Sequence, residues 1–248
     1  MRGPALLARG AAGIALASCG GGKPAPEPGP KISAVPLTRV PVEEPPESDD
    51  GVQVITDKGH VEPAAVDAGI APYREALSSC YTRRVGRRRW LGGHLSLRWE
   101  VAADGSIDRV LLADSDLGAW PVEKCVLEAA RAASFGVPIG GAAEVTLPLE
   151  FSARGTPVVW DDAQSVKAVG GQLARLDACA KGKVAMPDDV RITVYVGPRG
   201  RAQSVGFASP TTVLDDAWAT CAEKAALGWR LPDPRGQVTK LAVRYRPR

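Results

Sequence analysis

The sequence predicts an α+β fold in which two tandem α-β-β-α-β units follow a disordered, proline-rich tether. Three observations lead to this prediction. The region before residue 66 is rich in proline and acidic side chains, whereas the remainder has the apolar periodicity of helices and strands. That remainder shows the same order of patterns twice. Each copy contains two cysteines at matching places, so we expect two small antiparallel sheets, each covered by two helices.

The chain begins with a pattern typical of an exported bacterial lipoprotein. A basic start and an apolar stretch too short to span a bilayer precede Leu16-Ala17-Ser18-Cys19, which resembles a lipobox. We therefore expect residues 1–18 to be a signal peptide and Cys19 to be lipidated. The alternative is an ordinary cleaved signal in which Cys19 is incidental. Lipidation at Cys19 is expected to anchor the protein to a membrane of the cell envelope. Gly20 after the cysteine resembles the residue that permits outer-membrane sorting in enterobacterial lipoproteins, so we expect the outer membrane, facing the periplasm.

Residues 19–65 are predicted to form a disordered tether. Eight prolines lie between Lys23 and Pro46, and an acidic cluster follows them. Proline removes backbone donors and favours extended chain, and like charges repel one another, so this segment cannot form a core. Within it, residues 52–55 are predicted to form at most one short strand.

Each predicted unit begins with an amphipathic helix. In the first unit, Val66, Ile70, Tyr73, Leu77 and Cys80 follow one another at helical spacing. In the second unit, Val166, Val169, Leu173, Leu176 and Cys179 do the same. We therefore place the two units at residues 66–153 and 160–248.

A hairpin, a second helix and a closing strand follow in each unit. The hairpin strands alternate apolar and polar residues, which is typical of a sheet with one buried face, and a glycine at each turn supplies the positive φ of a tight hairpin. Pro148 in the first closing strand predicts an edge position or a bulge, because proline cannot donate to a ladder. The expected strands and helices are 95–101, 107–113, 119–134 and 145–151 in the first unit, and 190–196, 202–208, 214–227 and 241–245 in the second.

The four cysteines after Cys19 are expected to form disulfides, because an exported chain with cysteines at paired positions is usually cross-linked. Four cysteines permit three pairings, and the repeat favours Cys80–Cys125 and Cys179–Cys221. Free buried thiols are the alternative.

The motifs of the first unit resemble those of the AgmX/PglI C-terminal domain of myxobacterial envelope proteins, a relative of the TonB C-terminal fold. The resemblance covers about residues 66–152, and the second unit matches more loosely, with Cys179-Ala180 in place of Cys-Tyr. It implies a TonB C-terminal-like fold and no catalytic residues. The motifs that carry it are Cys80-Tyr81, Leu91-Gly92-Gly93, Ala103-Asp104-Gly105-Ser106-Ile107, Val122-Glu123-Lys124-Cys125-Val126 and Phe135-Gly136-Val137-Pro138.

No set of residues predicts catalysis, a metal site or a cofactor. His60 lies in the tether, His94 is expected to be solvated at the start of a strand, and no pair of cysteines has the spacing of a zinc site. The carboxylates Asp114 and Asp116 are expected to cap the second helix. We therefore expect a non-enzyme. A carboxylate beside His94 in a pocket would instead favour an enzyme.

The sharpest candidate for binding is a basic segment at residues 83–90. Its arginines suit phosphates or carboxylates because guanidinium forks bind such groups with two hydrogen bonds. A solvated basic loop at a helix C-terminus is the alternative, and export argues against nucleic acid as the partner. The candidate contacts for an anionic ligand are Arg83, Arg84, Arg87, Arg88, Arg89 and Trp90.

Two functions are therefore expected. In the first, a lipid-anchored binding or scaffold module engages an envelope protein, with strand addition to a sheet edge as one route. In the second, the basic segment binds an envelope polymer, either peptidoglycan or lipopolysaccharide.

Overall fold

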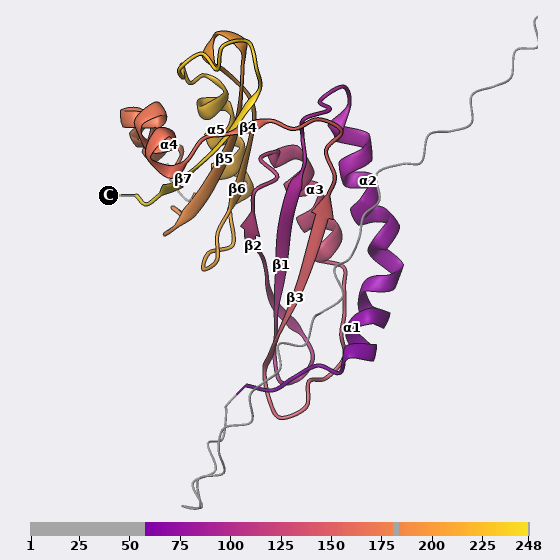
Figure 1. The fold of residues 1–248 in the computed structure, drawn as a ribbon. Helices are drawn as coiled ribbons and strands as arrows, with labels where there is room; N and C mark the ends of the chain where they lie inside the picture. The colour runs from indigo at the N-terminus through magenta and orange to yellow at the C-terminus, as the bar shows by residue number, and fades with distance from the viewer. Residues whose placement is uncertain (1–57, 181–183, 248) are drawn as a thin grey trace, which may run out of the picture.

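The computed structural model describes residues 58–180 and 184–247 and has a mixed α+β architecture, as predicted (Figure 1). Cys19, the lipobox and most of the predicted tether, including the predicted strand at 52–55, lie outside the described residues. The first half contains α1 (Pro63–Ile70), the 3₁₀ helix η1 (Ala71–Tyr73), α2 (Arg74–Val85), β1 (Gly93–Val101), β2 (Ile107–Ser115), α3 (Trp120–Ala130) and β3 (Ala143–Phe151). The second half contains β4 (Val158–Val159), α4 (Asp162–Val169), the 3₁₀ helix η2 (Gly170–Cys179), β5 (Val190–Gly197), η3 (Pro198–Gly200), β6 (Arg201–Ala208), α5 (Asp216–Leu227) and β7 (Thr239–Tyr245).

The first sheet has β1 at its centre, with the antiparallel strands β2 and β3 on either side. Alternate residues of β1 are completely buried, among them Leu95, Leu97 and Trp99, because they face the helices. The Trp99 indole donates a hydrogen bond of 2.9 Å to the Ala130 carbonyl at the end of α3. The period-two pattern of this strand therefore identified its buried face.

The second sheet has the order β4-β7-β5-β6, and β5 pairs antiparallel with β6 and β7. Nearly every residue of β5 is buried, including Thr193 and Tyr195 on the face where alternation predicts exposure. Both faces are covered because α5 lies over one and segments of the first half lie over the other. The short strand β4, which the sequence did not predict, pairs parallel with β7.

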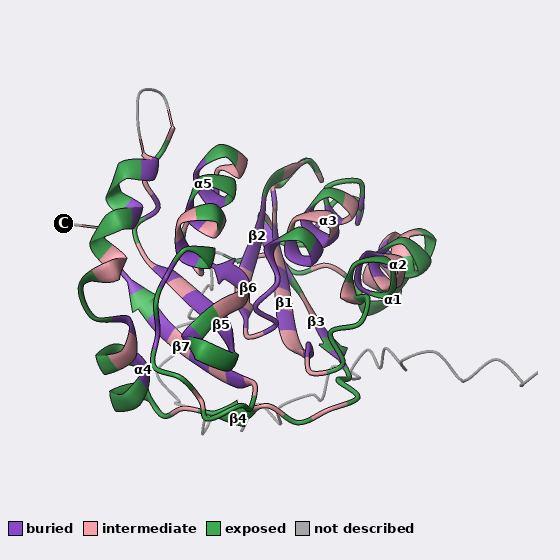
Figure 2. Cartoon of the chain, turned by 90° about the horizontal axis from the view of Figure 1, so that it is seen from above, coloured by how far each residue is buried: buried purple, intermediate pink, exposed green. Residues whose placement is uncertain are grey.

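The two sheets meet along β2 and β6. The Ser209 amide, just after β6, donates a hydrogen bond of 2.9 Å to the Leu112 carbonyl of β2, and α2, α3 and α5 lie on one side of the sheets (Figure 2). Buried apolar residues of both halves form one continuous core cluster. The halves therefore stabilise each other through a shared core.

Glycine and proline break both of the predicted opening helices. The first is divided into α1 and α2 by η1, which contains Pro72, and α2 continues to Val85. The second ends at Gly170, whose φ of 51° departs from helical geometry, and continues as the 3₁₀ helix η2. The helix predicted at 119–134 is shorter, because α3 ends at Ala130.

None of the helices within residues 58–180 and 184–247 has the length and apolar character that a bilayer crossing requires.

Candidate functional site

The two halves are joined by a buried carboxylate that the sequence analysis did not single out. Glu123, in the first turn of α3, is fully buried and accepts hydrogen bonds of 2.8 Å from the Phe207 amide of β6 and from the Ser115 hydroxyl of β2. Burial raises the pKa of Glu123 to about 7, against the opposing effect of these hydrogen bonds. The sequence did contain a signal of this burial, because Glu123 is spaced three residues from both Trp120 and Val126 and so lies on the buried face of the helix.

Tyr195 forms a second contact between the halves. Its hydroxyl, on β5, donates a 2.7 Å hydrogen bond to the Gly92 carbonyl and lies 3.3 Å from the Gly92 amide. The Trp90 ring packs on the Tyr195 ring with centroids 4.6 Å apart. Trp90 is therefore a half-buried contact between the two halves, and it does not line the cavity that the loop arginines form.

Beside Tyr195 lies a cluster of charged groups drawn from both halves. The His94 imidazole is between two carboxylates, with Nε2 2.9 Å from Asp114 and Nδ1 3.1 Å from Asp116. From the second half, Lys240 lies 2.8 Å from Asp116 and Arg191 lies 3.3 Å from Asp114. The expectation that these carboxylates cap α3 is wrong, because both end up in cross-strand ion pairs instead.

Contacts within the cluster shift the pKa values of His94 and Asp116 in directions that favour their charged forms, which suits a structural ion pair better than acid–base catalysis. The hydrogen bond with Asp116 raises the pKa of His94 to about 9, although partial burial opposes the rise. Burial would raise the pKa of Asp116, but hydrogen bonds from His94 and Lys240 outweigh it and hold that pKa well below its ordinary value. At neutral pH, His94 is therefore a cation with both ring nitrogens occupied, which leaves none to act as a general base.

The prediction that His94 is solvated is thus only half right, since 43 % of its side chain is exposed and the rest contacts the two aspartates. The cavity of about 610 Å³ beside Asp114 is lined by Arg191, Asp162 and Val166 and does not include the His94 ring. In the part of the chain that the structure describes, no group of histidine, cysteine and acidic side chains is arranged to hold a metal ion.

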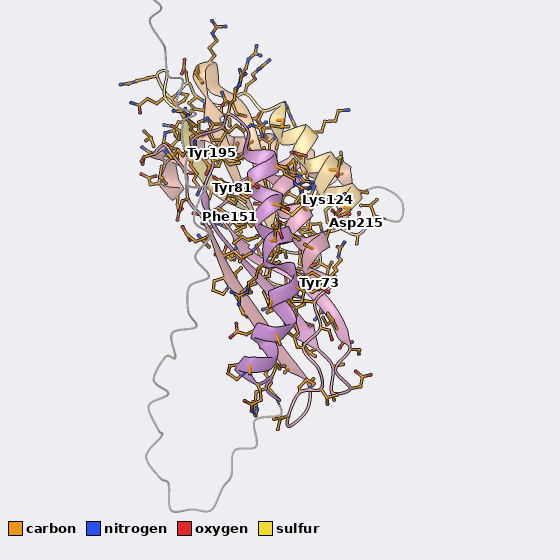
Figure 3. The ribbon with its side chains drawn as sticks, turned by 90° about the vertical axis from the view of Figure 1, so that its right-hand side faces the viewer. Tyr73, Tyr81, Lys124, Phe151, Tyr195 and Asp215 are labelled. Atoms are coloured by element: carbon orange, nitrogen blue, oxygen red, sulfur yellow. A yellow bond between two sulfur atoms is a disulfide. The ribbon has the colours of Figure 1, made fainter. Side chains whose placement is uncertain are left out.

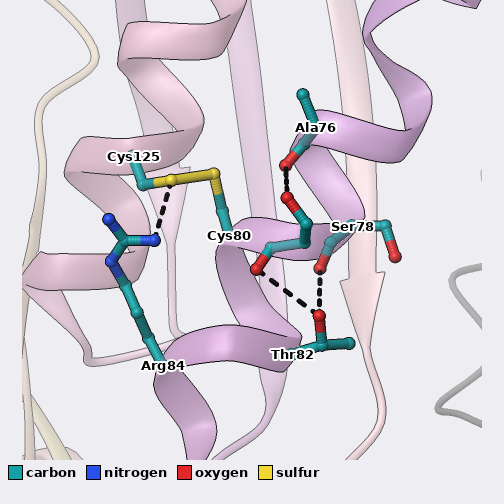
Figure 4. The surroundings of a disulfide bond; sticks show 7 residues. Ala76, Ser78, Cys80, Thr82, Arg84 and Cys125 are labelled. Atoms are coloured by element: carbon teal, nitrogen blue, oxygen red, sulfur yellow. Dashed lines mark hydrogen bonds between the residues drawn. A yellow bond between two sulfur atoms is a disulfide. The ribbon is translucent and has the colours of Figure 1, made fainter.

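The basic segment is divided by the fold. Arg83 and Arg84 end α2 and are exposed, and Arg84 donates a hydrogen bond of 3.0 Å to the Cys125 sulfur (Figure 4). Arg87, Arg88 and Arg89 are exposed on the loop after α2. Arg83 and Arg84 do not line the cavity that the three loop arginines share.

The three loop arginines line a cavity of about 700 Å³ together with the end of α2 and with Ser152 and Arg154, which follow β3. The loop and the later segment are held together because the Arg89 carbonyl accepts hydrogen bonds of 2.8 and 2.9 Å from the Arg154 and Gly155 amides. No sequence signal pointed to Arg154, which is far from the loop along the chain.

Tyr81 forms the floor between these segments. Its hydroxyl donates to the Leu91 carbonyl at 2.7 Å and to the Ser152 carbonyl at 3.1 Å. Its ring packs on Phe151 with centroids 5.0 Å apart (Figure 3). Both walls of the cavity are therefore attached to one buried side chain.

Two disulfides are present, Cys80–Cys125 and Cys179–Cys221, which is the pairing that the repeat favoured. The first joins α2 to α3 (Figure 4), and the second joins η2 to α5. Each ties the opening helical segment of its half to the helix that follows the hairpin. The first bridge also fixes the helix from which the arginine loop departs.

Among the described residues, no strand pairs with the outer edge of β3, although Lys58 lies 3.5 Å from Glu144 at its start. The Asp116 amide donates a hydrogen bond to the His94 carbonyl, so the backbone N–H and C=O groups of even-numbered residues of β1 point toward β2. The backbone groups of its odd-numbered residues therefore point toward β3. In the paired register, Glu144, Thr146, Pro148 and Glu150 therefore direct their backbone groups outward. Pro148 occupies a position where no ladder donor is needed, which confirms the predicted edge strand.

Two of the other edge strands, β2 and β6, meet each other. β2 and β6 lie side by side, and β7 is flanked by β4 and α4. The outer strand of the second sheet, β4, has only two residues, so β3 is the longer outer edge in the described structure.

Comparison of the chain with protein-family models, with curated proteins and with solved structures finds no match, so the arrangement of its own side chains is the basis for assigning a function.

Proposed function

We propose that the protein is a non-enzymatic lipoprotein of the cell envelope, anchored through Cys19 at the outer membrane, whose globular part binds a protein partner in the periplasm. The lipobox-like sequence and the proline-rich tether support the location. The charged cluster supports a structural role for the His94 imidazole, because both of its nitrogens are held in ion pairs.

The two halves are proposed to be diverged copies of one TonB C-terminal-like unit of the AgmX/PglI type. The order helix, hairpin, helix, strand in each half supports this, as does a central strand, β1 or β5, that is followed by its hairpin partner. The disulfides at equivalent places in the two halves give further support.

The open edge of β3 is the observation that supports protein binding most directly. An extended segment of a partner would pair with the outward N–H and C=O groups of Glu144, Thr146 and Glu150. The exposed carboxylate of Glu150 favours a basic partner segment, whereas Glu144 already pairs with Lys58. Pro148 offers no donor, so pairing is strongest on either side of it, which restricts the register.

Affinity capture from envelope extracts tests this proposal. Thr146→Pro removes one outward donor and leaves the ladder to β1 intact, so it should abolish capture of any protein that binds this edge. Thr146→Val keeps the N–H and should retain that protein. Equal capture by the two variants would rule out strand addition at β3.

The location is tested separately by mass spectrometry of the purified mature protein. The expected mass is that of a chain beginning at Cys19 with acyl groups added. A mature chain that retains Met1 would refute the lipoprotein assignment.

A further inference from the structure

The arginine-lined cavity brings together guanidinium groups from two distant parts of the chain. Arg87, Arg88 and Arg89 come from the loop after α2, and Arg154 comes from the segment after β3. At about 700 Å³ the cavity falls within the range of small-molecule sites, which is about 300–1,000 Å³.

The backbone around the cavity is held in place without any ligand. Besides the bonds from Arg154 and Gly155 to the Arg89 carbonyl, the Leu91 amide donates a hydrogen bond of 3.0 Å to the Arg88 carbonyl. Tyr81 ties the far wall to Leu91 and Ser152. Binding would therefore order side chains rather than whole loops, which lowers its entropic cost.

The arginine loop after α2 concentrates positive charge at this cavity. Among the described residues, no carboxylate forms an ion pair with Arg87, Arg88 or Arg89. Arg88 is close enough to Glu223 of α5 to oppose the burial that raises the pKa of that carboxyl. The C-terminus of α2 adds only about half a negative charge, so the guanidinium groups dominate the local field.

We infer that this cavity binds a phosphate monoester carried by an envelope glycan or lipid. A phosphate monoester has close to two negative charges and three acceptor oxygens at neutral pH, so it can engage several guanidinium forks at once. A single carboxylate has one charge and is satisfied by one fork. The inference gives the expected polymer-binding function a defined ligand group and site, and it is independent of strand addition at β3.

Isothermal titration of the purified protein at constant ionic strength tests the choice of ligand group. Glucose 1-phosphate should bind measurably, and glucuronate, which has one carboxylate on a similar sugar, should bind at least tenfold more weakly. Equal affinity for the two would overturn the phosphate assignment and leave recognition of anionic polymers standing. No binding of either sugar would overturn both and leave the β3 proposal unaffected.

Variants test the position of the site. Arg89→Gln and Arg154→Gln should each weaken binding of glucose 1-phosphate about tenfold or more, because each removes a charge-assisted hydrogen bond. Arg83→Gln is the matched control: it removes one exposed arginine close in sequence but outside the cavity, and it should change affinity less than twofold. Thermal unfolding of each variant separates loss of binding from loss of folding.

A similar loss in Arg83→Gln and in the cavity variants would show that diffuse charge, not the cavity, attracts the ligand. Arg89→Lys keeps the charge without the fork and should lie between wild type and Arg89→Gln.

Vesicles identify the natural carrier. Phosphatidylcholine vesicles containing phosphatidic acid present a phosphate monoester on a membrane surface. Co-sedimentation that Arg89→Gln abolishes indicates a lipid headgroup, whereas binding of the soluble sugar phosphate alone indicates a glycan. Co-sedimentation that survives both Arg89→Gln and Arg154→Gln would overturn the inference for membranes.

Discussion

Glu123 is the side chain whose ionisation bears most directly on the contact between the halves. Its carboxylate joins α3 to β2 and β6, and burial shifts its pKa from 4.5 to about 7. Between these two values the folded protein holds a proton that the unfolded chain releases. Its contribution to stability is therefore largest below about pH 4.5 and decreases as the pH rises to about 7.

Glu123→Gln removes this dependence. We expect the variant to lose less stability than wild type between pH 5 and pH 8, by up to about 3 kcal/mol, because the amide cannot ionise and still accepts a hydrogen bond from Phe207. Urea unfolding across that range measures the effect. Parallel pH profiles for the two proteins would contradict it.

His94 has a pH dependence of the same sign, in a higher pH range. Its pKa is raised from 6.5 to about 9 by Asp116 and Asp114, so its stabilisation is complete below about pH 6.5 and is lost as the pH rises through about 9. His94→Asn should therefore lower the free energy of unfolding more at pH 6 than at pH 9.5. Partial exposure screens the ion pairs and keeps the loss below what the shift alone implies.

His60→Asn is the control for this prediction, because His60 is exposed and its ring lies 3.5 Å from one described carboxylate, that of Glu62. It should show no comparable pH dependence. Equal losses for His94→Asn at both pH values would mean that the ion pairs contribute little.

At the scale of elements, β6 can approach α3 closely only because residue 206 has no side chain. A Cβ at Gly206 would lie 2.3 Å from a Glu123 carboxylate oxygen and 2.5 Å from the Ala119 amide. The pairing of these two elements therefore depends on glycine at this position.

Gly206→Ala should destabilise the protein by about 1–3 kcal/mol through overpacking. Gly171→Ala is the control, because a Cβ there meets no atom within 4 Å, and it should be close to neutral. Denaturant unfolding compares the two, and similar small effects would show that β6 can move away from α3.

Each disulfide stabilises the packing of one pair of elements, α2 with α3 or η2 with α5. The bridges close loops with sequence separations of 45 and 42 residues, and chain-entropy estimates give about 4 kcal/mol for each. Replacing Cys179 and Cys221 together by serine should lower the free energy of unfolding by an amount of this order. Unfolding of the variant and of wild type without reductant measures it, and an unchanged midpoint would refute a stabilising role.

Across the whole molecule, Lys124 of α3 lies 3.2 Å from Asp216 at the start of α5, where Asp215 caps the helix (Figure 3). Together with Glu123 and Tyr195, these contacts join two halves that share one core. The described part of the chain is therefore expected to unfold as one cooperative unit.

Tryptophan fluorescence and far-ultraviolet circular dichroism should accordingly give one coincident unfolding transition, because buried tryptophans lie in both halves. Tyr195→Phe removes the hydroxyl that bonds both the amide and the carbonyl of Gly92, and leaves the carbonyl only the 3.3 Å contact with Lys240 Nζ. It should shift that transition without splitting it. Two separate transitions in wild type would show that the halves are independent.

Much of the local structure was predictable from short-range patterns. The buried face of β1, the turn at Gly105 and the edge position of Pro148 follow from alternation and from the chemistry of glycine and proline, whereas the burial of both faces of β5 does not. Pro72 and Gly170 are themselves signals of the helix breaks, but the prediction from apolar spacing extended each helix through them.

The sequence by itself determined the secondary-structure order, the paired cysteines and the candidate arginines, because these depend on neighbours along the chain. Only the tertiary structure decided that Trp90 is an internal contact, that His94 lies between two aspartates, and that Arg154 joins the arginine loop. Those outcomes depend on packing two halves against each other, and distances between segments remote in sequence are set by that packing rather than by any local pattern.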